Sequence, residues 1–180
     1  MQGQAAEIAN AFTFAHTEAV RRGKPVFVVP GSVKVDGKLN GAATDWSTAN
    51  ALLVFTDNDA TNNQTFEANE DLRVVTLNDQ VPLSSITQEA LGSDVGKNAT
   101  DNKMTFVYYS NGQMRIKKDG TTLQAPGAIA RIVVKDKNRK TKNQVTRFCE
   151  VIRVDATGRS SVYTGKRSEL KDDKAFFYCE

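Results

Sequence analysis

The sequence lacks any long run of apolar residues. An α-helix needs about 20 such residues to cross a bilayer, and no stretch of the 180 residues meets that need. The first ten residues, MQGQAAEIAN, also lack the basic start and the apolar centre of a secretory signal peptide. The apolar fraction of 39% and the charged fraction of 25% are typical of a globular chain. We therefore expect one globular domain, residues 1–180, with no membrane span of its own.

The sequence also has few of the residues that catalysis uses. Its one histidine, His16, lies in a predicted helix with no nucleophile nearby, and the motif G-x-S-x-G is absent. Residues 92–98, GSDVGKN, are one residue short of a phosphate-binding loop. Residues 57–70 lack the glycine and the final glutamate of a calcium loop. We expect no enzymatic activity, no cofactor and no metal site.

Only two cysteines are present, Cys149 and Cys179. No further cysteine or histidine lies near them, so a zinc site is not expected. The pair is either a disulfide or two buried thiols. A disulfide would fix the C-terminal segment, stabilise the fold by roughly 3–4 kcal/mol and indicate an oxidising compartment.

The formal net charge of +3 hides an uneven distribution along the chain. Residues 45–101 hold ten acidic and two basic side chains, whereas residues 103–167 hold fifteen basic and four acidic ones. The basic side chains are densest in the segment KDKNRKTK, residues 135–142, which includes Lys137, Arg139, Lys140 and Lys142. Clustered cations can bind phosphates of nucleic acids, but no aromatic residues are interleaved to stack on bases. The segment is either a solvated charged loop or a weak anion site.

The chain begins with one helix, and β patterns follow it. Ile8, Phe12, Ala15 and Ala19 recur at helical spacing over residues 4–22, and Gly23 is placed to cap the helix end. Strands are predicted at residues 25–31, 33–41, 51–57, 71–77, 104–118, 128–134, 145–154 and 160–166, with a loop at 78–102. An Asp-Gly turn lies within 33–41, and 51–57 and 71–77 are expected to form a long hairpin. The hairpin at 104–118 turns at Asn111-Gly112. This order predicts an α+β fold in which the helix, residues 4–22, packs on antiparallel β-sheets formed by residues 25–180.

The order of these motifs resembles a known family, the minor pilins and pseudopilins of the FimU, FimT and type II secretion H-subunit group, and FimU most of all. The phrase FAHTEAVRRGKPV at 14–26 is similar to the end of the family's helix. Trp46, ALLVFTDND at 51–59 and DLRVV at 71–75 follow in the family's order, although its second tryptophan is missing. Phe106, Gly112 and the turn within VIRVDATGRSSVY at 151–163 complete the resemblance.

The resemblance implies a pilin-like fold. Residues 4–22 would be the periplasmic part of a longer helix whose apolar half, absent here, is anchored in the inner membrane and methylated at its start. Ile8, Phe12, Ala15 and Ala19 would pack the helix on the sheet. The resemblance also implies a disulfide between Cys149 and Cys179.

The implied function is that of a structural minor pilin of a bacterial type IV pilus, with roles in assembly priming, the pilus tip, twitching motility, adhesion and DNA uptake. Its partners would be other minor pilins and the major pilin, first in the inner membrane and periplasm and then at the cell surface. Two alternatives are a secretion pseudopilin and a DNA-binding pilin. The DNA-binding branch uses a Gly-Arg-x-Arg phrase, and here Arg159 is followed by two serines.

Overall fold

The computed structural model describes residues 2–57, 64–79, 83–89, 99–100, 103–119, 122–123, 129–135, 149–155 and 157–164. Helix α1 spans Gln2–Arg22 and is followed by β-strands only in this part of the chain. Every strand pairing within it is antiparallel. The predicted α+β fold, a helix followed by antiparallel sheets, is confirmed.

The strands of the described residues form two sheets. Sheet A has the order β4-β3-β1-β7-β8-β9, and β2 pairs with β1 beside this path. Its strands are β1 (Val26–Val33), β2 (Leu39–Ala42), β3 (Ala51–Phe55), β4 (Asp71–Thr76), β7 (Thr105–Tyr108), β8 (Met114–Lys118) and β9 (Thr122–Leu123). Sheet B has the order β12-β11-β10-β5-β6. Its strands are β5 (Leu83–Glu89), β6 (Ala99–Thr100), β10 (Ile129–Lys135), β11 (Cys149–Val154) and β12 (Ser160–Thr164).

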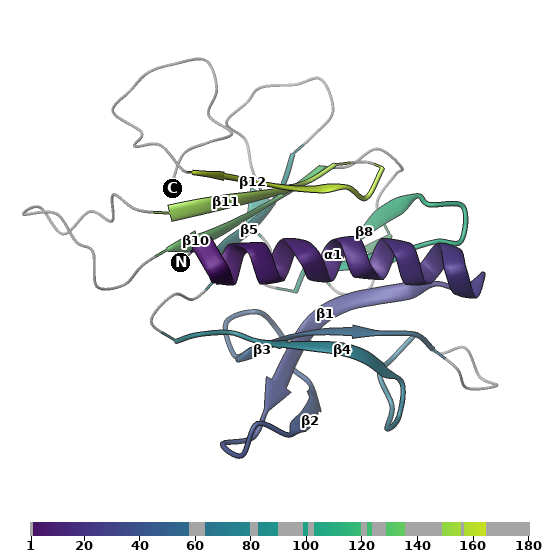
Figure 1. Ribbon diagram of the computed structural model, residues 1–180, viewed down its shortest axis with the longest axis horizontal. Helices are drawn as coiled ribbons and strands as arrows, with labels where there is room; N and C mark the ends of the chain where they lie inside the picture. Colours follow the sequence, from purple (N-terminus) through teal and green to yellow (C-terminus); the bar gives the residue numbers. More distant parts are fainter. Residues whose placement is uncertain are drawn as a thin grey trace, which may run out of the picture.

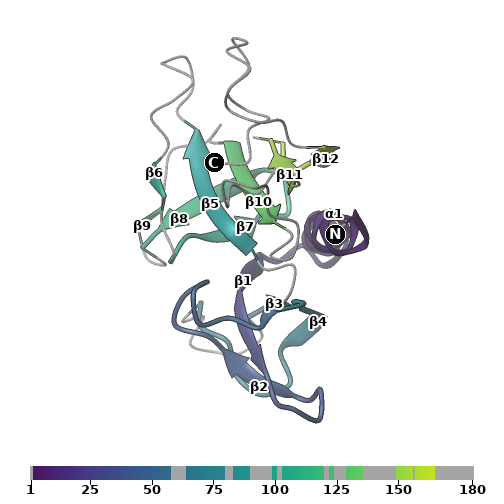
Figure 2. The ribbon, with the colours of Figure 1, turned by 90° about the vertical axis from the view of Figure 1, so that its left-hand side faces the viewer.

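Helix α1 lies along the junction of the two sheets. In Figure 1 it runs between β10, β11 and β12 on one side and β1, β3 and β4 on the other. Figure 2 looks along the helix and shows it flanked by both sheets. One continuous apolar core joins the buried face of α1 to alternate residues of both sheets, for example Val54 of β3 and Ile152 of β11. The helix therefore packs against two sheets rather than one.

Local sequence signals account for several element ends. Gly23 adopts a positive φ of 67° and donates its N–H to the carbonyl oxygen of Ala19 at 3.1 Å, which ends α1. Gly112, with φ 80°, makes the predicted turn between β7 and β8. Gly37, also with φ 80°, turns β1 into β2. The predicted hairpin from 51–57 to 71–77 is confirmed as the pair β3 and β4.

Two sequence predictions about strands were wrong. The strand at 25–31 was expected to end with Pro30 and Gly31, but β1 continues to Val33. The carbonyl oxygen of Pro30 accepts a bond from the N–H of Ala43 at 2.9 Å. The N–H group that proline lacks would therefore have faced position 43, beyond the end of β2. Its absence removes no hydrogen bond between β1 and β2 and costs little stability. The loop expected at 78–102 contains β5 and β6. In β5 the apolar residues Leu83 and Ile86 are three positions apart, so no alternating pattern marked the strand.

Candidate functional site

The predicted packing face of α1 is buried against the sheets. Ile8, Phe12, Ala15 and Ala19 each have 0% of their surface exposed. The Phe12 ring meets Phe106 of β7 edge to face, with ring centroids 4.9 Å apart. The alanines carry only a methyl group, so the helix backbone can approach both sheets closely.

Polar contacts fix the first half of α1 to both sheets. The Gln4 side chain accepts a bond from the Asn78 N–H at 2.9 Å and donates to the carbonyl oxygen of Thr76, the last residue of β4, at 3.4 Å. One turn later, the Ser160 hydroxyl of β12 donates to the Ala9 carbonyl oxygen at 2.7 Å. Together with the interdigitated apolar packing, these directional bonds fix the position of the helix along its axis.

A cluster around Tyr108 of β7 joins α1 and sheet A to the turn that precedes β12 in sheet B. The Tyr108 hydroxyl donates to the Gly158 carbonyl oxygen at 3.1 Å, and the His16 ring packs edge-on against the Tyr108 ring at 5.9 Å between centroids. Burial raises the pKa of Tyr108 well above its ordinary value, and the charge of Asp155 acts in the same direction. A Cβ at Gly158 would lie 2.3 Å from Tyr108 Cε1, so only glycine fits there.

The C-terminal turn of α1 holds a compact ion-pair cluster. Arg21 donates two hydrogen bonds to the two carboxylate oxygens of Glu18, at 2.8 and 2.6 Å, and Arg22 Nε donates at 2.7 Å. The bonds from Arg21 and then Arg22 lower the pKa of Glu18 from 4.5 to about 2. This cluster was not identified from the sequence. The i, i+3 and i, i+4 spacing from Glu18 was the signal for this cluster.

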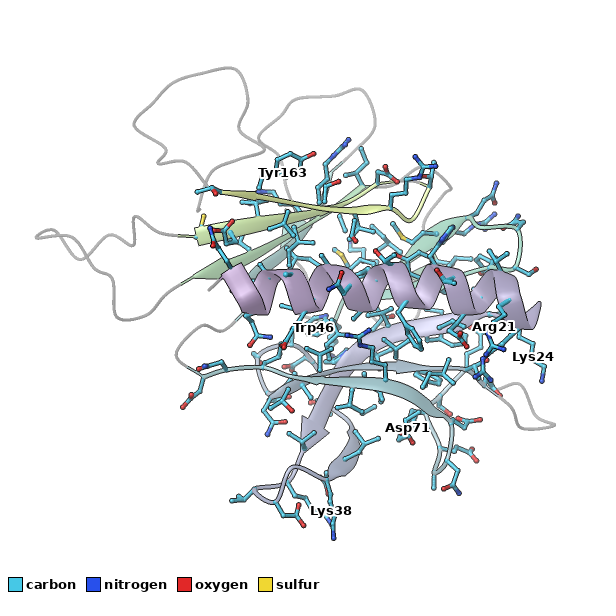
Figure 3. The ribbon with its side chains drawn as sticks, viewed as in Figure 1. Arg21, Lys24, Lys38, Trp46, Asp71 and Tyr163 are labelled. Atoms are coloured by element: carbon cyan, nitrogen blue, oxygen red, sulfur yellow. The ribbon has the colours of Figure 1, made fainter. Side chains whose placement is uncertain are left out.

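The opposite face of α1 is exposed. It carries mostly small or polar residues, and Val20, half exposed, is its largest aliphatic side chain. The exposed residues of α1 are Gln2, Gly3, Ala6, Glu7, Asn10, Thr13, Thr17, Val20, Arg21 and Arg22. Figure 3 shows Arg21 and Lys24 at the C-terminal end of the helix and Trp46 below its N-terminal half. The Trp46 Nε1–H group donates to the Met104 carbonyl oxygen at 2.6 Å in the core.

The remaining predicted site residues are only partly covered by the structure. Cys149 is fully buried in β11, whereas Cys179 lies outside the described residues, so their pairing stays a prediction. Lys137, Arg139, Lys140 and Lys142 also lie outside the described residues, and Arg159 is exposed just before β12. Across the described ranges, no three metal-ligating side chains come together, and no helix combines the length and apolarity needed to cross a bilayer.

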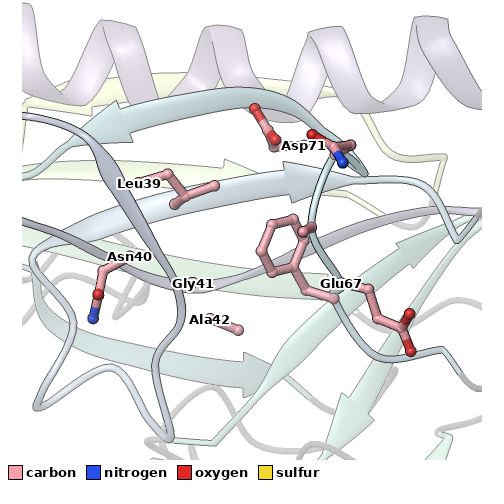
Figure 4. Close-up of a pocket in the computed structure, with 9 residues that line it drawn as sticks. Leu39, Asn40, Gly41, Ala42, Glu67 and Asp71 are labelled. Atoms are coloured by element: carbon pink, nitrogen blue, oxygen red, sulfur yellow. The ribbon is translucent and has the colours of Figure 1, made fainter.

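A groove that the sequence did not indicate lies at one end of sheet A, on the opposite side of the sheet from α1. It has a volume of about 480 Å³. All four residues of β2 line one wall, and residues from the segment 66–71 line the other. Figure 4 shows Glu67 and Asp71 on the wall that faces Leu39 and Ala42 of β2. We call this cavity the β2 groove.

Comparison with known proteins identifies the family of this chain. A family model described as "Type II transport protein GspH" matches residues 4–158, from the first turn of α1 to the turn at Gly158. The chain belongs to the GspH family. Its members are minor pilins and pseudopilins, which are structural subunits that assemble with other pilins. No curated protein sequence matches the chain significantly.

Two solved structures are similar to this GspH-family chain. Both are crystal structures of the type IV minor pilin FimU of Pseudomonas aeruginosa strain PAO1. The form in space group P65 has a TM-score of 0.48 and 14% sequence identity, covering 91% of this chain and 92% of FimU. The form in space group P21 has a TM-score of 0.45 and 14% identity, covering 90% of this chain and 87% of FimU.

Proposed function

We propose that this chain is a structural minor pilin of a bacterial type IV pilus that helps to prime filament assembly and lies near the pilus tip. The observation that carries the proposal is the way α1 is held. One face is buried on both sheets, and hydrogen bonds fix its position, while a stripe of small and polar residues faces outward. A subunit built this way presents a rigid helix to its neighbours without unfolding its β domain.

The anchoring of the subunit follows from the same proposal. Residues preceding α1 in the full-length protein would form an apolar helix of about 20 residues in the inner membrane. The β domain would then lie in the periplasm before assembly. In that oxidising compartment we propose a disulfide between Cys149 and Cys179, and the mass of the intact protein before and after reduction and alkylation tests it.

Incorporation into filaments tests the main proposal. The full-length protein is expressed in a pilus-forming strain that lacks the corresponding gene, and sheared pili are examined by immunoblotting. Val20 and Val162 provide a matched pair, because they are 50% and 39% exposed, on α1 and on β12. Val20→Arg should abolish incorporation by placing a long charged side chain at the one aliphatic position larger than alanine on the outward stripe of the helix, whereas Val162→Arg should not. Absence of the wild-type protein from pili would refute the proposal.

A second candidate is a pseudopilin of a type II secretion system. The description of the matching family favours it, since that description names type II transport. The two functions separate in a strain that has both machines. Deletion of the gene would abolish twitching in the first case and secretion of exoproteins in the second.

DNA binding remains a prediction from the basic residues Lys137, Arg139, Lys140, Lys142 and Arg159. A gel-shift titration at increasing salt tests it. Tight binding that weakens steeply with salt and is lost on neutralising Arg139, Lys140 and Lys142 would support a DNA-binding pilin.

A further inference from the structure

Two asparagines of the chain, Asn40 and Asn111, are followed by a glycine. At such a pair the backbone nitrogen of the glycine can attack the side-chain carbon Cγ of the asparagine, because glycine has no Cβ to hinder the approach. A five-membered succinimide ring forms, and the side-chain nitrogen takes up the proton of the attacking nitrogen and leaves as ammonia. Solvent water then opens the ring at one of its two carbonyl groups and leaves an aspartate or an isoaspartate. Because water is the only co-reactant, the local structure decides which asparagine reacts.

The structure restrains both reacting groups of the pair at Asn111. The Gly112 N–H donates to the Tyr109 carbonyl oxygen at 2.9 Å, and Asn111 Oδ1 accepts a bond from the Gln113 N–H at 3.0 Å. On the helix side, His16 Nε2 lies 3.2 Å from the position that a Cβ would take at Gly112. The attack at this pair therefore requires the turn between β7 and β8 to break its hydrogen bonds and to leave α1.

The pair at Asn40 is much less restrained. Strand β2 pairs only with β1 among the described strands, and none of its four residues is buried. The Asn40 side chain is exposed and makes no hydrogen bond in the part of the chain that the structure describes. A Cβ at Gly41 would meet nothing within 4 Å. Figure 4 shows Asn40 and Gly41 next to each other in β2. No neighbouring side chain therefore blocks a movement of this backbone.

The pairing of β2 with β1 is also short and irregular. The Ala43 N–H donates to the Pro30 carbonyl oxygen, and bonded and non-bonded pairs alternate along an antiparallel ladder, so Gly41 faces Ser32 in the next bonded pair. The register shifts directly after Ser32, and such a bulge disrupts the ladder. The Gly41 N–H group is thus held at the last regular pair before a bulge, where local opening costs little free energy.

We propose that Asn40 is a site of spontaneous deamidation and that the folded chain reacts there in preference to Asn111. The two pairs have the same chemistry, so the preference comes from the free energy of local opening. An isoaspartate at position 40 would add one atom to the backbone of β2 and change the register of the residues that follow it. The reaction does not depend on the proposed function, because it needs neither an enzyme nor a partner subunit.

Peptide mapping of aged protein tests the preference. The folded chain of residues 1–180 is incubated near neutral pH in water enriched in oxygen-18, which distinguishes deamidation during the incubation from deamidation during digestion. Trypsin releases Asn40 in the peptide 39–73 and Asn111 in the peptide 104–115, and fragmentation locates the modified residue. We expect Asn40 to deamidate at least about tenfold faster than Asn111. Equal rates, or a faster reaction at Asn111, would overturn the proposal.

Two controls separate the effect of the fold from the effect of the sequence. In concentrated urea, which unfolds the chain, the two asparagines should react at similar rates because both precede glycine; a preference for Asn40 that persists there would refute the structural cause. His16→Ala removes the ring beside Gly112 and should speed deamidation of Asn111 without changing that of Asn40. An unchanged rate at Asn111 would refute the contact with α1 as its protection.

Hydrogen exchange of the deamidated fraction tests the structural consequence. Ion-exchange chromatography separates this fraction by its additional negative charge, and the fraction should be missing from Asn40→Gln but present in Asn111→Gln. Amides of residues 39–43 should exchange faster in the isoaspartate form than in Asn40→Asp, which carries the charge without the additional backbone atom. Equal exchange in the two would refute the change of register. The pilin role has a separate readout, since Asn40→Gln should enter pili like the wild type.

Discussion

Gly158 and Gly37 allow the Tyr108 cluster to be tested with a matched pair of substitutions. Both glycines have nearly the same positive φ, 79° and 80°. At Gly37 an added Cβ would meet nothing within 4 Å, whereas at Gly158 it would lie 2.3 Å from Tyr108 Cε1. Changing either glycine to alanine carries the left-handed backbone cost of about 1–2 kcal/mol. Only Gly158→Ala adds an overpacking cost of about 1–3 kcal/mol.

Urea denaturation of the two variants measures this difference in unfolding free energy. Gly158→Ala should be less stable than Gly37→Ala by about 1–3 kcal/mol, with similar m-values. The double variant Gly158→Ala/Tyr108→Val removes the clashing ring atoms. It should therefore lose less stability than the sum of its single substitutions, with a coupling of similar size. Equal stability of the two glycine variants, within about 0.5 kcal/mol, would refute the packing of the 155–159 turn on Tyr108.

Three further predictions concern α1 and its surroundings. Phe12→Ala should lower the unfolding free energy by about 3–5 kcal/mol, and Phe12→Leu by less, because only the first leaves a large cavity; equal, small effects in urea would contradict the buried position. Glu18→Gln should destabilise the protein at neutral pH, because folding lowers the Glu18 pKa from 4.5 to about 2. The difference in melting temperature between variant and wild type should be full above pH 4.5 and vanish toward pH 2. Trp46→Phe should cost about 1–3 kcal/mol, because the Met104 carbonyl oxygen loses its buried donor; an unchanged melting temperature would argue against that bond.

The parts of the fold that could be predicted from sequence depend on neighbouring residues. Gly23, Asn111-Gly112 and the spacing of Ile8 and Phe12 determine the helix end, the hairpin turn and the buried helix face through contacts a few positions apart. Strand β5 could not be predicted, because the pairing with β10 that holds it involves residues forty to fifty-one positions away. Its own sequence shows no alternation that would compensate for this.

The candidate site also has a part that could be predicted from the sequence and a part that could not. The packing face of α1 was visible in the sequence because it is a periodic pattern on one element. The Tyr108–Gly158 contact joins residues fifty positions apart, and the β2 groove arises only when β2 and the segment 66–71 are placed around sheet A. Neither leaves a local pattern, since each residue involved is ordinary for a turn or a strand end.

Hydrogen exchange of α1 is the measurement that tests the central claim most directly, namely that the helix is fixed to both sheets as one rigid subunit. Amides of residues 8–19 in the native protein are followed by mass spectrometry and compared with those of β1 and β3. The structure predicts that they exchange as slowly as the central strands, through global unfolding. Fast exchange of the helix while the strands stay protected would show that α1 detaches from the sheets, and would contradict the account.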